Sequence, residues 1–354
     1  MKPPAVLPVG SGTWSWIRQG GKPHRGSVTT ALFYRWKSFW FERHLALQKS
    51  ADQPAAAPLA PPVFILGLWR SGTTFLHDLL SAGPGLIYPA TWQCMSPASF
   101  RLRPPPAPGP AVQRPMDNFT IDALSPQEDE FALLALGVPS AYRGFLDPRR
   151  LPELARWLDP DAWGRDRPAG WLETWLQFLT GVTAGRTGRL VLKSPGHTFR
   201  IQAVADAFPA SAVVWLVRDP TEVFLSNRKM WPAMFGQYAL WDWDESVLDA
   251  FLATALTRAA ECLQRATRLL PAGRLAVVPF DQLIRAPLDT VEAINRRLAL
   301  GDAAELRAAA GRIATAKADY QANVHAPREL PETVRRAIGL LQSAQQAALA
   351  SHGI

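Results

Sequence analysis

Cysteine is almost absent from the sequence, which has only Cys94 and Cys262 among its 354 residues. Two cysteines so far apart support neither a framework of disulfides nor a cysteine-based zinc site. The scarcity of cysteine also agrees with a reducing compartment. We therefore expect a cytoplasmic protein.

Long apolar runs are absent as well. No stretch has the roughly 20 uncharged apolar residues that a membrane-spanning helix requires. Residues 1–22 lack the apolar segment of a signal peptide. The chain is expected to be soluble or bound to a membrane surface, without crossing the membrane.

Acidic residues are outnumbered, with 30 aspartates and glutamates against 38 lysines and arginines and a formal net charge of +8. The excess of positive charge suits an anionic partner. Nucleic acid, a membrane surface and a small phosphorylated ligand all meet that description, so charge alone does not choose among them.

The chain divides at a proline-rich stretch. Residues 51–62, "ADQPAAAPLAPP", are typical of a connector. Before them, residues 31–46 mix aromatic and basic side chains at helical spacing, which describes either a helix on a membrane surface or one that caps the protein. We favour the cap. The predicted organisation is an N-terminal extension, partly helical and partly irregular, over residues 1–60 and a main domain over residues 61–354.

Four apolar segments in the main domain have the pattern of buried strands. They are residues 63–68, "RLVLKSP" from 189, "SAVVWLVRDP" from 211 and "RLAVVPF" from 274. Helical periodicity follows each of them, and long amphipathic helices are predicted over residues 244–270 and 331–349. Strand and helix in alternation predict an α/β protein in which a central parallel sheet is flanked by crossover helices.

The first of these strands leads into a turn rich in glycine, serine and threonine. Residues 64–80 read "FILGLWRSGTTFLHDLL". Backbone N–H groups and a helix N-terminus meet at such a turn and form an anion site. The spacing nearly matches a nucleotide-binding P-loop, but Thr73 stands where that motif requires lysine. This favours a phosphate-like group bound without a metal ion.

Four blocks of the sequence together resemble the sulfotransferase superfamily, and in particular its bacterial branch. The blocks are "FILGLWRSGTTFLHDLL", "SPQEDEFALL", "LVLKSPGHTFRI" and "FPASAVVWLVRDPTEVFLS". They occur in the family order and cover much of residues 63–230. The resemblance implies a three-layer, P-loop-like α/β fold. It also implies an enzyme that transfers the sulfuryl group of 3′-phosphoadenosine 5′-phosphosulfate to a hydroxyl or amine of an acceptor.

The resemblance also implies roles for individual residues. The residues that would hold the 5′-phosphosulfate are Arg70, Ser71, Gly72, Thr73 and Thr74, and Arg70 is also counted among the catalytic residues. Arg218 and Ser226 would hold the 3′-phosphate, because a guanidinium can donate two hydrogen bonds to phosphate oxygens. Lys193 would stabilise the leaving phosphate oxygen. No metal ion is expected.

The residue that takes the acceptor proton stays open at this point. Relatives can use a histidine near the lysine or a glutamate after the first helix, but Gln93 stands near that glutamate position and cannot accept a proton. We expect His197 or Glu130 to be the base, with Asp129 as a further candidate. Glu128 completes an S-x-x-E pattern with Ser125 and is interpreted as part of a helix cap.

Two other functions compete with sulfotransfer. A small-molecule P-loop kinase is disfavoured by Thr73 and by the lack of an evident magnesium-binding aspartate. A basic nucleic-acid or membrane-binding protein would use the 14 tryptophans and the positive charge, but the basic residues are dispersed, so no nucleic-acid partner is expected. The acceptor is unknown, and the many aromatic residues suggest an apolar or lipid-like one. Peripheral contact with a membrane is allowed, and the oligomeric state is open. Tyr320, His325 and Arg328 are in a C-terminal segment that could close over the nucleotide.

Overall fold

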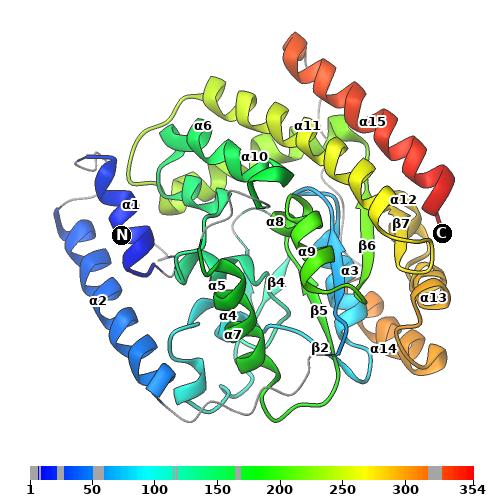
Figure 1. Cartoon of the computed structure of the whole chain (residues 1–354), viewed down its shortest axis with the longest axis horizontal. Coiled ribbons are helices and arrows are strands. Elements are labelled where there is room, and N and C mark those ends of the chain that lie inside the picture. Colours follow the sequence, from blue (N-terminus) through cyan, green and yellow to red (C-terminus); the bar gives the residue numbers. More distant parts are fainter. Residues whose placement is uncertain are drawn as a thin grey trace.

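A five-stranded parallel sheet forms the centre of the protein (Figure 1). The structure, a computed structural model, describes residues 7, 9–21, 28–50, 60–114, 116, 119–163, 169–317 and 329–354. The strand order is β2-β5-β1-β6-β7. Their bounds are β1 Val63–Leu66, β2 Leu86–Ile87, β5 Arg189–Lys193, β6 Ala212–Val217 and β7 Leu275–Pro279. A separate two-stranded hairpin consists of β3, Val112–Gln113, and β4, Thr120–Ile121.

The four strands predicted from sequence are all present, and a fifth, β2, has only two residues and was not predicted. Strand β1 is shorter than expected: it ends at Leu66, because Gly67 adopts a φ of 142° and starts the turn. In register, Val63 pairs with Val191 of β5 and with Ala212 of β6. The central position of β1 in the sheet therefore brings the ends of β5 and β6 to either side of the turn that follows β1.

Helices cover both faces of the sheet (Figure 1). In chain order the α-helices are α1 Ser11–Gln19, α2 Val28–Ser50, α3 Thr73–Ser81, α4 Thr91–Met95, α5 Glu130–Ala135, α6 Leu151–Leu154, α7 Trp171–Thr183, α8 Pro195–Thr198, α9 Ile201–Ala207, α10 Pro220–Tyr238, α11 Glu245–Leu269, α12 Phe280–Arg285, α13 Pro287–Leu298, α14 Ala303–Ala316 and α15 Glu332–His352. Short 3₁₀ helices are η1 Phe100–Leu102, η2 Ala141–Phe145, η3 Pro148–Arg150, η4 Ala155–Leu158 and η5 Pro160–Trp163.

Alternate residues of each strand pack into two different cores, one on each face of the sheet. Phe64 and Leu66 join a large core with residues of α7, α10, α11 and α15. Val63 and Ile65 join a smaller core with residues of α3, α13 and α14. Such alternation is the period of two that a strand imposes on its side chains. The three-layer α/β fold with a central parallel sheet is thereby confirmed.

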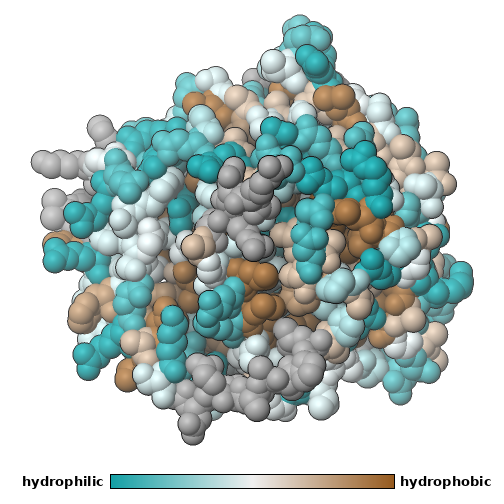
Figure 2. All heavy atoms as spheres, in the orientation of Figure 1, coloured by the Kyte–Doolittle hydropathy of each residue, from teal (hydrophilic) through white to brown (hydrophobic). Residues whose placement is uncertain are grey.

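The first 60 residues contribute α1 and α2, and the predicted helix over residues 31–46 lies within α2. Ile17 of α1 and Tyr34 of α2 are buried in the large core. The division at residue 60 stays a prediction. Figure 2 shows hydrophilic residues over much of one face of the molecule, with hydrophobic residues exposed at a few places near its middle. No helix among the described residues has both the length and the apolar character needed to cross a membrane.

Candidate active site

The turn between β1 and α3 has the backbone of an anion-binding loop. Gly72 is the N-cap of α3, has a φ of 96° and offers no side chain to accept hydrogen bonds from the first turn of the helix. A Cβ at this position would lie 2.4 Å from a ring carbon of Phe280, so glycine is required. Arg70 also lies in the left-handed region, with a φ of 71°. Strained backbone of this kind is concentrated at ligand-binding loops.

Arg70, Ser226 and Arg218 lie close together at the end of the loop. The Nε of Arg70 donates to the Oγ of Ser226 over 3.0 Å. The Nη1 of Arg218 donates to the backbone oxygen of Arg70 over 2.9 Å. The guanidinium of Arg218 also lies over the ring of Phe280, 4.5 Å from its centroid. Two guanidinium groups are therefore fixed beside the N-terminus of α3, where their charge and its N–H groups attract the same anion.

Lys193 ends β5 and is buried, with only 2% of its side chain exposed. Its Nζ donates to the Oε1 of Glu128 over 2.6 Å and lies 3.4 Å from the Oγ1 of Thr74. The Oγ1 of Thr74 also lies 3.4 Å from the Nη1 of Arg114, a residue to which the sequence analysis assigned no role. The lysine is thus held between the first turn of α3 and a carboxylate.

The second oxygen of Glu128 accepts a short hydrogen bond from the hydroxyl of Tyr142. That hydroxyl accepts in turn from the Nε1 of Trp69, over 3.1 Å. Burial, together with the adjacent Glu128 carboxylate, raises the pKa of Tyr142 well above its ordinary value. Tyr142 therefore keeps its proton and donates it to Glu128. Lysine and tyrosine on opposite oxygens hold this carboxylate in one orientation.

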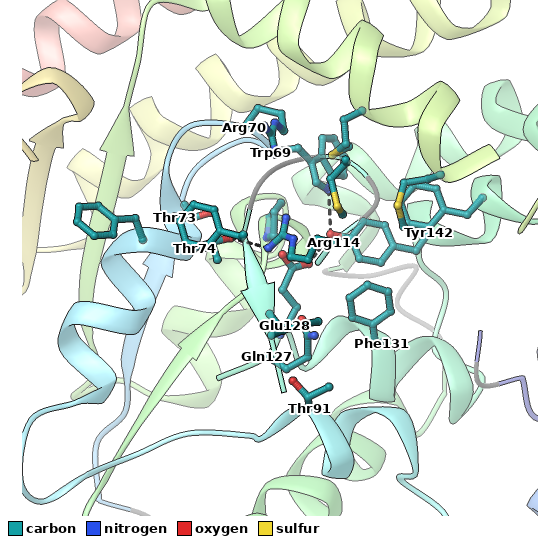
Figure 3. A pocket seen from close by; sticks show the side chains of 18 of the residues that line it. Trp69, Arg70, Thr73, Thr74, Thr91, Arg114, Gln127, Glu128, Phe131 and Tyr142 are labelled. Atoms are coloured by element: carbon teal, nitrogen blue, oxygen red, sulfur yellow. Dashed lines mark hydrogen bonds between the residues drawn. The ribbon is translucent and has the colours of Figure 1, made fainter. Parts of the chain in front are cut away.

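A pocket of about 1140 Å³, its open mouth included, is lined by Arg70, Thr74, Glu128 and Arg218 (Figure 3). Lys193 lines a second cavity, which shares Thr74, Arg114 and Gln127 with the first. Thr73, Thr74 and Arg70 lie on one part of its wall and Glu128 on another (Figure 3). The rest of the wall is mainly apolar: Trp69, Phe75, Met95, Met116, Phe119, Ile121, Phe131, Tyr142, Phe145, Met230, Met234 and Tyr238. One end of the pocket therefore suits an anion and the other an apolar molecule.

The two acids that follow Glu128 point away from the pocket. Asp129 is fully buried and accepts from the Nε2 of His197 over 2.9 Å and from the Nε1 of Trp175 over 2.7 Å. Glu130 makes a two-pronged ion pair with Arg200, with N–O distances of 2.6 and 2.9 Å. For both acids burial acts to raise the pKa, but their partners outweigh it, and both carboxyl pKa values lie below the ordinary ones. Both groups are charged parts of the core.

The placement of His197 and Glu130 corrects two expectations. His197 is completely buried, with its ring 4.6 Å from that of Trp175 and 5.8 Å from that of Phe64. Glu130 has 2% of its side chain exposed. Neither lines the pocket among the described residues. An acceptor in the pocket could reach neither group, because both are enclosed by aromatic or paired side chains.

The cap that was predicted from Ser125 and Glu128 is also wrong. Helix α5 begins at Glu130, so Glu128 precedes it, and the backbone N–H of Glu128 donates to the Oε1 of Gln127. The Ser125 hydroxyl donates to Asp122 instead. Gln93 is buried and its Oε1 accepts from the backbone N–H of Ala90, which agrees with a structural glutamine. Glu128 is thus the acid that the sequence analysis set aside and the structure puts at the pocket.

Metal ligands do not gather in the described part of the chain, where no three His, Cys, Asp or Glu side chains are placed to hold an ion. Tyr320, His325 and Arg328, which were suggested to close over the nucleotide, lie outside the described residues.

The comparisons with known proteins agree with this geometry. The sequence profile of the sulfotransferase family matches residues 61–303. Proteins named omega-hydroxy-beta-dihydromenaquinone-9 sulfotransferase Stf3, from Mycobacterium tuberculosis and Mycobacterium bovis, are each 29% identical over 280 residues, which is 78% of this chain and 70% of theirs.

Two solved structures have the same fold. Sulfotransferase STF9 from Mycobacterium avium matches with a TM-score of 0.69 at 19% identity, over 97% of this chain and 91% of that one. Sulfotransferase STF1 from Mycobacterium tuberculosis matches with a TM-score of 0.62 at 19% identity, over 94% and 90%. With the family profile on more than half of the chain, the kinase and the nucleic-acid-binding alternatives fall away. The chain belongs to the sulfotransferase family and is an enzyme that transfers a sulfuryl group from a donor to an acceptor.

Proposed function

We propose that the donor is 3′-phosphoadenosine 5′-phosphosulfate, as the family resemblance implies. The N–H groups at the start of α3, with Arg70 and Thr73, would hold its 5′-phosphosulfate. Arg218 and Ser226 would hold the 3′-phosphate, and their contacts with Arg70 keep the two anion subsites adjacent. Thr73 in place of the P-loop lysine supports a nucleotide bound without magnesium.

Calorimetry tests this donor with a ligand that cannot react. We expect 3′,5′-adenosine bisphosphate to bind tightly in the presence of a metal chelator, because the loop and two arginines supply the charge. Arg218→Ala should weaken this binding. Arg18→Ala, at the end of α1, also removes one arginine but lies away from the pocket, so it is the matched control and should leave binding unchanged. Stronger binding of ATP with magnesium than of the bisphosphate would contradict the proposed donor.

Glu128 is the group that we propose as the acceptor base. Its carboxylate lies in the pocket wall, and Lys193 and Tyr142 orient it. A carboxylate with four lone-pair positions can accept a proton from an acceptor hydroxyl in addition to these two hydrogen bonds. Proton removal by a positioned side chain typically contributes 10²–10⁴-fold to the rate.

The roles of the remaining groups follow from where charge changes during transfer. The bound donor supplies the sulfuryl group, whose bond to the bridging oxygen breaks as a new S–O bond forms with the acceptor. Glu128 takes the proton that the acceptor hydroxyl loses. Lys193, with the N–H groups of the loop, stabilises the negative charge left on the phosphate oxygen. The products are a sulfate ester and adenosine 3′,5′-bisphosphate.

For the acceptor we propose an apolar, lipid-like molecule that carries a hydroxyl. The main support is the composition of the pocket wall, which includes four of the five methionines in the chain: Met95, Met116, Met230 and Met234. Flexible thioether side chains adapt to long apolar ligands. The relatives from the two mycobacteria are named for a hydroxylated menaquinone, a molecule of this class.

Acceptors of increasing chain length test this class directly. With primary alcohols, kcat/KM should rise by about fourfold for each CH₂ group that becomes buried, which corresponds to about 0.8 kcal/mol. The increase should stop when the chain is longer than the apolar wall. Faster turnover with sugars or charged amines than with apolar alcohols of equal size would contradict an apolar acceptor.

A further inference from the structure

Helix α2, Val28–Ser50, has an unusual distribution of side chains. Nine large hydrophobic residues are exposed in the described part of the chain, and six of them are on this helix: Leu32, Phe33, Trp36, Phe39, Trp40 and Leu47. Trp36 is 56% exposed and Phe39 62%. At about 100° per residue, the six fall within about 120° of the helix circumference and form one strip. This apolar strip faces away from the protein.

The side of α2 that faces the protein carries both polar and apolar side chains. Ser38 and Gln48 are buried there together with Tyr34. The Nε2 of Gln48 donates to the backbone oxygen of Pro97, and its Oε1 accepts from the backbone N–H of Arg101. A surface helix normally turns its apolar face toward the core and a polar face toward solvent. The exposed apolar strip is a second apolar surface, and burial within the protein does not explain it.

The charges on α2 are also divided between the two sides. Arg35, Lys37 and Arg43 are exposed on or beside the apolar strip. The ammonium group of Lys37 lies 5.6 Å from the ring centroid of Phe33, and the guanidinium of Arg43 lies 5.9 Å from that of Trp40. Glu42, the single acid in the helix sequence, accepts from the backbone N–H of Ser11 in α1. The exposed side thus combines aromatic residues with positive charge only.

We propose that the apolar strip of α2 docks on an anionic lipid bilayer and lies in its interface. Tryptophan and phenylalanine partition into the interface, while lysine and arginine reach the lipid phosphates. A second copy of the chain suits this surface poorly, because a twofold contact would bring the same three cations of both copies together. Helix α2 runs along the outer edge of the molecule, where one side of it is uncovered (Figure 1).

The inner side of α2 is fixed to the protein. Tyr34, on this side of the helix, is buried beside Trp14 of α1, with the two rings stacked at 6.5 Å. With Gln48 hydrogen-bonded to the backbone near α4, this packing holds the apolar strip on the outside of the molecule.

Vesicle sedimentation tests the proposal with the whole chain and does not depend on the donor or acceptor proposed above. We expect binding to phosphatidylcholine vesicles that contain phosphatidylglycerol, weaker binding without it, and release at high salt. The double substitution Trp36→Ser with Phe39→Ser should weaken binding about tenfold or more. Leu340→Ser, which removes an exposed leucine from α15, is the matched control and should bind like the unchanged chain.

Two further measurements keep the outcome unambiguous. An unchanged far-ultraviolet circular dichroism spectrum and melting temperature show that a variant is folded. If the double variant does not fold, Lys37→Glu with Arg43→Glu takes its place, with the same loss expected. The proposal is overturned if the unchanged chain does not bind anionic vesicles. It is also overturned if the α2 variants bind as well as Leu340→Ser, or if light scattering shows that the substitutions only dissociate a dimer.

Discussion

The Nζ of Lys193, at the end of β5, lies 2.6 Å from the Oε1 of Glu128, just ahead of α5. Two similar contacts follow along the chain: Asp129 contacts His197, and Glu130 contacts Arg200. Of the three acids, only Glu128 lines the pocket. One short acidic segment therefore supplies a catalytic candidate, a buried hydrogen bond to His197 and a buried ion pair with Arg200.

Glu128→Gln tests the proposed base. Glutamine keeps the shape and, with its single amide oxygen, one of the two hydrogen bonds from Tyr142 and Lys193. It cannot take a proton, so we expect kcat to fall by about 10²-fold or more. Affinity for 3′,5′-adenosine bisphosphate should change by no more than a few-fold. The matched control is Glu153→Gln, at an exposed glutamate paired with Arg150 on the surface. Normal turnover by Glu128→Gln would show that another group takes the proton.

Arg218→Ala and Lys193→Ala separate donor binding from catalysis. Arg218 is expected to contact a phosphate that does not change during the reaction, so its loss should weaken bisphosphate binding by about tenfold or more. Lys193 is proposed to stabilise charge that develops during transfer, so its loss should lower kcat more than affinity. Calorimetry and steady-state kinetics measure the two effects. Equal losses of affinity with intact turnover in both variants would contradict these roles.

Glu130→Gln should mainly lower stability. It removes one charge of a buried pair and leaves the guanidinium of Arg200 unpaired beside Trp163, 4.2 Å from the ring centroid. Breaking a buried pair in this way typically costs about 3–5 kcal/mol. Urea unfolding measures the change, and Glu153→Gln again serves as the control, because exposed pairs contribute little. Undiminished stability together with a large loss of kcat would restore Glu130 as a catalytic residue.

Stability should fall in acid through Asp129 and Glu130. Their pKa values in the folded protein lie below the ordinary 3.8 and 4.5, so the unfolded chain binds their protons at a higher pH than the folded protein does. Their contribution is complete above about pH 5 and is lost as pH falls below about 4. Unfolding free energies measured across this range should decrease accordingly. The decrease should be shallower in Glu130→Gln, and an unchanged slope would contradict the assignment.

Much of the fold was predictable because its signals are local. The apolar runs around Val63, Leu190, Val213 and Leu275 became strands, since residues buried on both faces of a parallel sheet are apolar without alternation. The anion loop was predictable for the same reason: Gly67, Gly72 and the two threonines after Gly72 lie within one short segment, residues 67–74, and their backbone requirements are local. The two-residue strand β2 has too short a pattern to be recognised.

The sequence by itself determined the succession of strands and helices along the chain, the anion loop and which acidic and basic residues are present. Tertiary structure decided which acid meets the pocket. Glu128, Asp129 and Glu130 are adjacent in sequence and similar in chemistry, but the start of α5 at Glu130 sends their side chains in different directions. Their partners come from residues 193–200, at the end of β5 and in the segment after it, more than 60 positions away. Local propensity carries no information about such a contact, since burial and charge pairing between distant segments establish it only when the chain is folded.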